Sequence, residues 1–142
     1  MMKAQWLMFA LGSAAFGGVT AILAKVGVSG VDSNLATFYR TLVVLAFAGL
    51  LVSWRGDWAQ LGSLSARNLA FLTLSGVATA ASWLCYFRAL QLAPASMVAP
   101  IDKLSVVVAV VLGVALLAEP MSWRLLMGVG LIVAGSVVIA GI

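Results

Sequence analysis

The sequence has no histidine, a single cysteine and only four acidic residues among its 142 positions. Without histidine there is no Ser/His/Asp arrangement, and no metal-ligand cluster or phosphate-cradling Gly-Lys-Ser/Thr loop is found either. The lone Cys85 excludes an intramolecular disulfide and any multi-cysteine metal site. The sequence therefore predicts a protein that is not an enzyme and that carries no metal and no cofactor.

Charge is also scarce: charged residues make up 8% of the chain, against 64% hydrophobic residues. The mean hydropathy of +1.18 lies outside the range of soluble domains. We therefore predict a multi-pass protein of the cell membrane (inner or plasma) in contact with membrane lipid. The net charge of +4 comes from basic residues near the ends of apolar stretches, so nucleic acid is not an expected partner.

Five long apolar stretches fill the chain, and each is close to the roughly 20 residues that a helix needs to cross a bilayer. Their continuous hydrophobicity favours helices over barrel strands, in which apolar and polar residues alternate. The expected fold is an all-α membrane protein, and residues 1–142 form one domain with short connections. The predicted spans are residues 4–24, 34–54, 68–90, 97–118 and 123–142.

An odd number of spans places the two termini on opposite sides of the membrane. With that topology the basic residues divide four against four, counting those inside the spans: Lys3, Arg55, Arg67 and Arg124 on one side; Lys25, Arg40, Arg88 and Lys103 on the other. Such balance suits insertion in both orientations, and many transporters are built from inverted repeats with a substrate site at their interface. A fixed orientation in a chain with few charges explains the count equally well.

The charges inside the spans are the sharpest functional signal. Ionisable groups at membrane depth are costly and usually face a bundle interior or a water-filled cavity, so Arg40, Asp102 and Lys103 are candidate substrate-binding residues. Pro100 removes a backbone hydrogen bond one turn before Lys103 and can loosen the helix beside these charges. The alternative is that the lysines and Arg88 extend to lipid headgroups while Asp102 neutralises one of them.

The third span carries hydroxyl groups at helical spacing beside large rings. Ser75, Thr79, Ser82 and Tyr86 follow one stripe, and Trp83, Phe87 and Leu90 lie on the adjacent face. Such a helix suits a cavity wall for an amphipathic small molecule, so Trp83 and Tyr86 join the candidate site. The alternative is that the hydroxyls bond to their own helix and the rings face the lipid interface.

Small residues recur at helix-face spacing in the first and last spans. Gly128 and Gly135 are seven residues apart, and small residues let helix backbones approach closely in a bilayer. We predict that both glycines form a subunit contact. Packing within the chain is the competing interpretation.

Several motifs resemble the EamA domain of the drug/metabolite transporter superfamily. They are the stretch from Trp83 to Leu90, the stretch from Ala93 to Pro100, the run Leu117-Ala118-Glu119-Pro120, and Phe16-Gly17, Lys25 and Phe38-Tyr39-Arg40. Most members of that family resemble two such domains fused into ten helices with inverted topology. The resemblance implies that this chain is one half, and that a second copy or a related subunit completes it.

The last span also resembles the dimerisation helix of small multidrug resistance proteins, which adds weight to Gly128 and Gly135. Those proteins carry a glutamate in the first span, and no acidic residue lies between Ala4 and Ala24 here. Their cation/proton exchange mechanism is therefore not carried over.

Together these features predict a transporter for a small metabolite or drug, working by alternating access as a homodimer in an antiparallel or parallel arrangement. The excess of positive charge favours an anionic or zwitterionic ligand. An accessory or scaffold subunit of a larger membrane complex and a lipid flippase subunit remain alternatives. The former needs no internal cavity, and the latter has a cavity that opens laterally.

Overall fold

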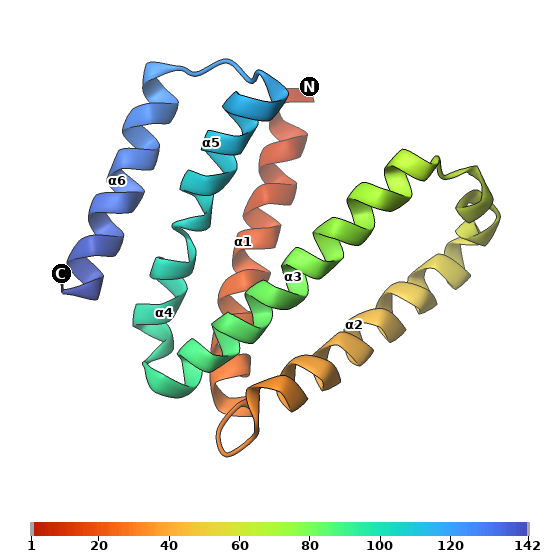
Figure 1. The fold of residues 1–142 in the computed structure, drawn as a ribbon, viewed down its shortest axis with the longest axis horizontal. Helices are drawn as coiled ribbons and strands as arrows, with labels where there is room; N and C mark the ends of the chain where they lie inside the picture. The colour runs from red at the N-terminus through yellow and green to blue at the C-terminus, as the bar shows by residue number, and fades with distance from the viewer. Residues whose placement is uncertain (1, 142) are drawn as a thin grey trace. The chain divides into compact units, whose positions relative to one another are not determined.

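The computed structural model of the chain describes residues 2–141, with side chains described from residue 5 onward. The predicted end of the last span at residue 142 lies outside this range. Within it the chain forms six α-helices, one 3₁₀ helix and no β-strand (Figure 1). The elements are α1 (Met2–Gly27), α2 (Ser33–Arg55), η1 (Asp57–Ser63), α3 (Ala66–Leu92), α4 (Ala95–Asp102), α5 (Ser105–Leu117) and α6 (Trp123–Ala140).

The five predicted spans are confirmed as helical segments, each within a few residues of the expected bounds. Five segments of the described chain are long and apolar enough to cross a membrane: Gln5–Gly27, Ser33–Arg55, Ala66–Leu92, Ala95–Leu117 and Trp123–Ala140. The fourth of them is not one continuous helix. It is divided into α4 and α5 by a break at Lys103 and Leu104.

The break follows from a change in the backbone ladder after Pro100. The amides of Lys103 and Leu104 bond to the carbonyls of Pro100 and Ile101, three residues back, at 3.1 and 2.9 Å. Val106 and Val107 also bond three residues back. Such 3₁₀ bonds tighten the turn and change the helix direction. The helix near Pro100 is therefore broken rather than loosened, and the break is centred three to four residues after the proline.

Polar side chains cap the starts of α2 and α6, and a glycine ends α2. The carboxylate of Asp32 accepts from the amide of Asn34 at 2.8 Å at the start of α2. The hydroxyl of Ser122 accepts from the amide of Leu125 at 3.2 Å at the start of α6, as expected for a capping serine. Gly56 ends α2 in the left-handed region, with φ of 72°, which costs glycine little.

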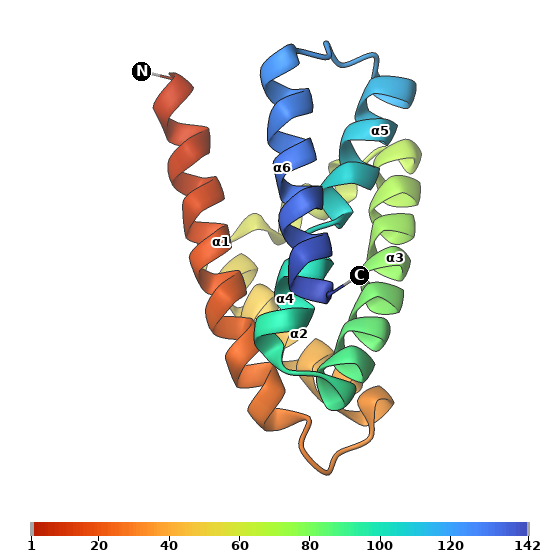
Figure 2. The same cartoon turned by 90° about the vertical axis from the view of Figure 1, so that its left-hand side faces the viewer.

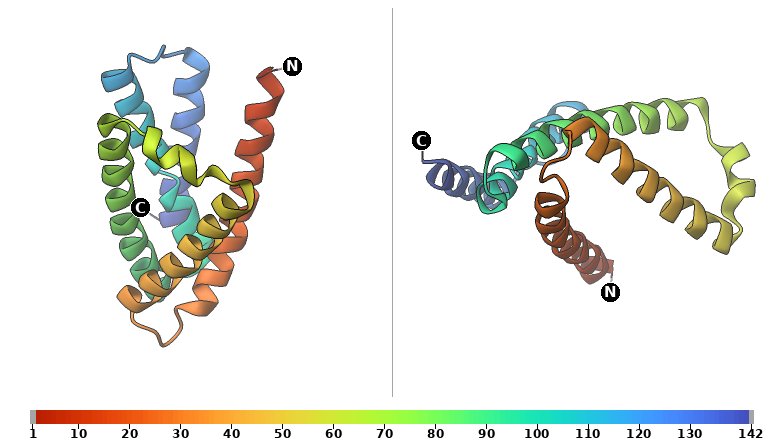
Figure 3. Two further views of the ribbon diagram at one scale, coloured as in Figure 1. Left: turned by 90° about the vertical axis from the view of Figure 1, so that its right-hand side faces the viewer. Right: turned by 90° about the horizontal axis from the view of Figure 1, so that it is seen from below.

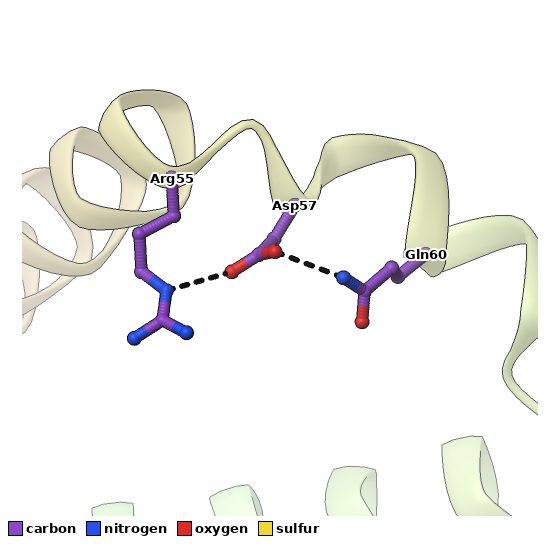
Figure 4. Close-up of polar contacts among 3 residues, drawn as sticks. All are labelled: Arg55, Asp57 and Gln60. Atoms are coloured by element: carbon purple, nitrogen blue, oxygen red, sulfur yellow. Dashed lines mark hydrogen bonds and ion pairs between the residues drawn. The ribbon is translucent and has the colours of Figure 1, made fainter.

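The connector between α2 and α3 contains the short helix η1. Asp57 organises its start: its two carboxylate oxygens accept from Arg55 Nε at 3.1 Å and from Gln60 Nε2 at 2.8 Å (Figure 4). The indole of Trp58 donates to the hydroxyl of Ser53 at 3.0 Å. A ring with one polar atom beside a charged pair is typical of the membrane–water interface.

The chain divides into two compact units, residues 1–25 with 92–142 and residues 26–91. The first, here called the α4–α6 unit, also contains most of α1, and in it α6 packs against α4 and α5. Within this unit α1 begins at the end where α5 gives way to α6, whereas α6 finishes toward the opposite end (Figures 1 and 2). The directions of the first and last helices match the topology expected from an odd number of spans.

The second unit, here called the α2–α3 unit, is a helical hairpin closed at its tip by η1. Near the open end the amide of Gln91 donates to the carbonyl of Val31 at 2.6 Å, which ties the end of α3 to the turn before α2. From there the two helices diverge toward η1 (Figure 3). Near this tied end, Arg40 of α2 contacts the rings of Trp83 and Phe87 on α3.

Most large apolar side chains are exposed in the single chain. Among the described residues the buried apolar side chains are Ala21, Val28, Phe87, Leu90, Ala95 and Val98. An exposed apolar surface of this kind is normal where lipid is the solvent, since lipid offers no hydrophobic drive for helix association. The surface is therefore available for acyl chains and for a further protein subunit.

Candidate functional site

Arg40 and Trp83 lie face to face within the α2–α3 unit. The guanidinium carbon of Arg40 stands 4.4 Å from the centroid of Trp83 and 5.6 Å from that of Phe87. Trp83 and Phe87 are four residues apart on α3, so both rings project from one face of that helix. Phe87 is only 2% exposed, which fixes the ring against which the cation rests.

The cation of Arg40 lies well inside the apolar helix. Seven residues separate it from Ser33 at the start of α2, which places it about 10 Å along the helix at 1.5 Å per residue. Among the described residues Arg40 takes part in ring contacts and an electrostatic interaction with Tyr86, but in no hydrogen bond and no ion pair. Its N–H donors remain available for a ligand.

Tyr86 lies on the same turn of α3 as these rings. Its ring centroid is 6.4 Å from that of Phe87, with 50° between the ring planes. Three predicted site residues, Arg40, Trp83 and Tyr86, are thus brought together in one unit, and Phe87 is a fourth member that the sequence did not nominate. Its position four residues after Trp83 was the available signal.

The hydroxyl stripe of α3 is in part bonded to its own helix. Thr79 Oγ1 donates to the carbonyl of Ser75 at 2.9 Å. For Thr79 this matches the alternative interpretation, in which a hydroxyl satisfies itself locally rather than lining a cavity.

Asp102 and Lys103 lie in the other unit, at the break between α4 and α5. Lys103 Nζ is 3.5 Å from Asp102 Oδ2, and the two side chains are 67% and 37% exposed. Adjacent residues within a helix diverge, but here the helix ends between them and the long lysine side chain folds back to the carboxylate. The pair is close to neutral, which leaves Arg40 as the uncompensated charge among the nominated residues.

A groove runs beside this break within the α4–α6 unit. It encloses about 530 Å³ and has apolar walls, with Lys103, Ser105 and Ser136 as polar members. A second depression of about 430 Å³ continues along α5 past Ala109 and Gly113 to Glu119. The face of α5 that runs from Ser105 through Ala109 to Gly113 is therefore hollowed along its length.

Gly128 and Gly135 leave open space around α6. A Cβ placed on either residue meets no atom of the described chain within 4 Å. Most other glycines of the chain share this openness, whereas a Cβ on Gly113 comes within 2.8 Å of the Glu119 carboxylate. The helix packing of the single chain does not require either glycine, so a partner remains free to use them.

Two contacts between distant residues were not anticipated. Ser136 Oγ donates to the carbonyl of Pro100 at 3.1 Å, and Lys25 Nζ donates to the carbonyl of Ala93 at 3.0 Å. Ser136 is the one hydroxyl of α6 and lies in a run that is apolar after Arg124, and that isolation was the only signal in the sequence. Among the described residues no group of three or more His, Cys, Asp or Glu side chains is placed to hold a metal.

Comparison with known proteins adds the biological context. Residues 4–141 match the EamA-like transporter family. The chain is 45% identical over 139 residues to an uncharacterized transporter in the cobO 3' region of a Sinorhizobium species, covering 98% of this chain and 99% of that protein. No solved structure matches.

Proposed function

Because this chain belongs to the EamA-like transporter family and is a multi-pass membrane transporter, we propose that its substrate is a small anionic or zwitterionic molecule whose negative group binds Arg40. The observation that carries this proposal is the guanidinium lying 4.4 Å from the Trp83 ring without a carboxylate partner among the described residues. The family supplies the transport activity, and the arginine supplies the expected charge of the substrate.

The energetics of Arg40 favour a ligand anion. A charged side chain at the centre of a membrane helix costs about 3 kcal/mol by insertion measurements. A contact with an aromatic face returns about 1 kcal/mol of that cost. Within the described part of the chain the ring contacts leave the five N–H donors of the guanidinium without acceptors. Carboxylates or phosphates match that fork with two parallel hydrogen bonds.

The rings beside Arg40 suit a substrate with an apolar part. Trp83 and Phe87 present faces on the same side of α3 as the cation, and Tyr86 adds a phenol group. Pockets for small molecules combine mostly apolar walls with a few placed polar groups. We keep Asp102 and Lys103 as further substrate-binding candidates, because a nearly neutral pair at a helix break can receive either charge of a zwitterion.

We further propose that the transporter is a homodimer that works by alternating access, with an antiparallel arrangement preferred. Five spans make half of the ten-helix architecture implied for the family, and transporters of this type bind substrate near helix breaks at the interface of inverted repeats. The open glycines of α6 support a close contact between the copies.

Transport assays on the purified protein in proteoliposomes test the substrate class. Counterflow is measured with three radiolabelled probes: benzoate as an amphipathic anion, leucine as a zwitterion and tetraphenylphosphonium as a lipophilic cation. We expect exchange of benzoate or leucine and none of the cation. Exchange of the cation alone would overturn the proposed charge of the substrate.

Crosslinking in membranes tests the dimer. Replacing Gly128 and Gly135 together by leucine should reduce the yield of crosslinked dimer, because the new side chains separate the helices. Gly49→Leu in α2 is the matched control, since a Cβ there also meets no atom within 4 Å. An unchanged yield in the double variant would remove α6 from the interface, and a crosslink to a different protein would favour an accessory subunit.

A topology reporter fused after α6 tests the arrangement. Activity on both sides of the membrane is expected if copies insert in opposite orientations, as the balanced basic residues allow. Activity on one side alone would exclude the antiparallel homodimer.

A further inference from the structure

The short helix α4 is held near both of its ends by side chains from other helices of its own unit. Just before its first turn, Lys25 at the end of α1 donates to the carbonyl of Ala93 at 3.0 Å. Two residues before its end, Ser136 of α6 donates to the carbonyl of Pro100 at 3.1 Å. These bonds join segments that are 68 and 36 residues apart in the chain.

The bond from Ser136 acts where the helix changes direction. The carbonyl of Pro100 also accepts from the amide of Lys103 at 3.1 Å, which is one of the bonds that tighten the break. A carbonyl oxygen has two lone pairs, so both donors are accommodated. The amide of Leu104, which would bond to Pro100 in a regular α-helix, bonds instead to Ile101.

Ser136 is not needed for apolar packing. It is 4% exposed and is the single hydroxyl of α6, where alanine would fill nearly the same volume. A buried hydroxyl requires a hydrogen-bond partner, and the one it has lies on the helix that packs most closely against α6. Its hydroxyl and the break line the same groove, together with Lys103 and Ser105.

We propose that Ser136 is a positioning residue for transport: its hydroxyl holds the bend between α4 and α5 and thereby sets the direction in which Lys103 faces the groove. When the hydrogen bond from Ser136 to Pro100 opens, the backbone hydrogen bonds after Pro100 can return to the α-helical pattern, and α4 can then rotate relative to α5. The inference rests on membership of the transporter family and on this geometry, and it does not depend on the charge of the substrate.

The test measures the exposure of the groove and needs no substrate. In a Cys85→Ala background, Ser105→Cys places one thiol in the groove, and its alkylation by N-ethylmaleimide is followed in proteoliposomes. Ser136→Ala should change the rate about fivefold, the scale expected for the loss of one hydrogen bond. Ser136→Thr keeps the hydroxyl and should restore the parent rate.

Two controls separate positioning from loss of structure. Thr41→Val removes a hydroxyl that donates only to its own helix, at 2.8 Å to the carbonyl of Thr37, and should leave the rate at Ser105→Cys unchanged. A second reporter, Gln60→Cys in η1, should react equally in the parent and in Ser136→Ala. The proposal is wrong if Ser136→Ala leaves the groove reporter unchanged, if it alters both reporters alike, or if Ser136→Thr behaves as Ser136→Ala does.

Discussion

Two regions of this protein hold charge inside apolar helices in different ways. In the α2–α3 unit the cation of Arg40 rests on the rings of Trp83 and Phe87 and has no carboxylate partner among the described residues. In the α4–α6 unit Lys103 is paired with its neighbour Asp102 at 3.5 Å, at a point where the helix is broken. The first arrangement leaves charge available for recognition, and the second neutralises charge where the backbone can bend.

The largest expected effect comes from removing the uncompensated cation. Arg40→Gln should lower the kcat/KM of uptake about 100-fold, because an anionic group would then be desolvated without its partner. Arg40→Lys keeps the charge but loses the planar fork and the ring contact, so a loss of about tenfold is expected. Initial uptake rates of the exchanged probe, benzoate or leucine, measure both, and equal rates in all three proteins would remove Arg40 from the site.

A smaller effect is expected at the paired charges. Asp102→Asn or Lys103→Ala should each lower uptake about tenfold, because each leaves one charge uncompensated at membrane depth. The double variant should recover part of that loss, since neither charge then remains.

The control for this pair is an ion pair between near neighbours in α2 and η1. Arg55 and Asp57 interact at 3.1 Å at the end of α2 rather than inside a span, and an ion pair in contact with water contributes little. Asp57→Asn should therefore transport at the parent rate. If Asp102→Asn and Lys103→Ala also transport at that rate, both residues leave the candidate site.

The smallest expected effect concerns the ring under the cation. Trp83→Phe keeps an aromatic face but offers a weaker cation contact than indole, so uptake should fall about threefold, with a larger loss for Trp83→Leu. Phe71→Leu is the control, because Arg67 stands 5.9 Å over that ring and the ring is 64% exposed. If Phe71→Leu reduced uptake as much as Trp83→Leu, the contact between Arg40 and Trp83 would have no special role in substrate binding.

The sequence predicted the helices well because their signals are local. Continuous apolar runs define the spans, and Ser122 could be assigned as a cap from its place before the last run. The sequence predicted the region of the break but not its position. Pro100 identified the region, whereas the position at Lys103 and Leu104 depends on backbone bonds that form three residues later.

The candidate site was predicted as residues rather than as geometry. Arg40 was nominated for its depth and Trp83 for its place on the face beside the hydroxyl stripe. Nothing in the sequence indicates that one lies over the other, because their contact joins residues 43 positions apart on two helices. The bond between Ser136 and Pro100 is of the same kind. Such long-range contacts depend on how helices pack, and a single sequence carries no direct record of that packing.

The shared direction of the first and last helices has a consequence for gene duplication. Since α1 starts at the end of its unit where α6 also starts, the chain finishes toward the other end (Figure 2). A tandem copy joined directly after α6 would enter the bilayer from that other side and would be inverted without any added crossing. A duplicated and fused gene of this kind would produce an antiparallel pair in a single polypeptide, with each half free to diverge on its own side of the membrane.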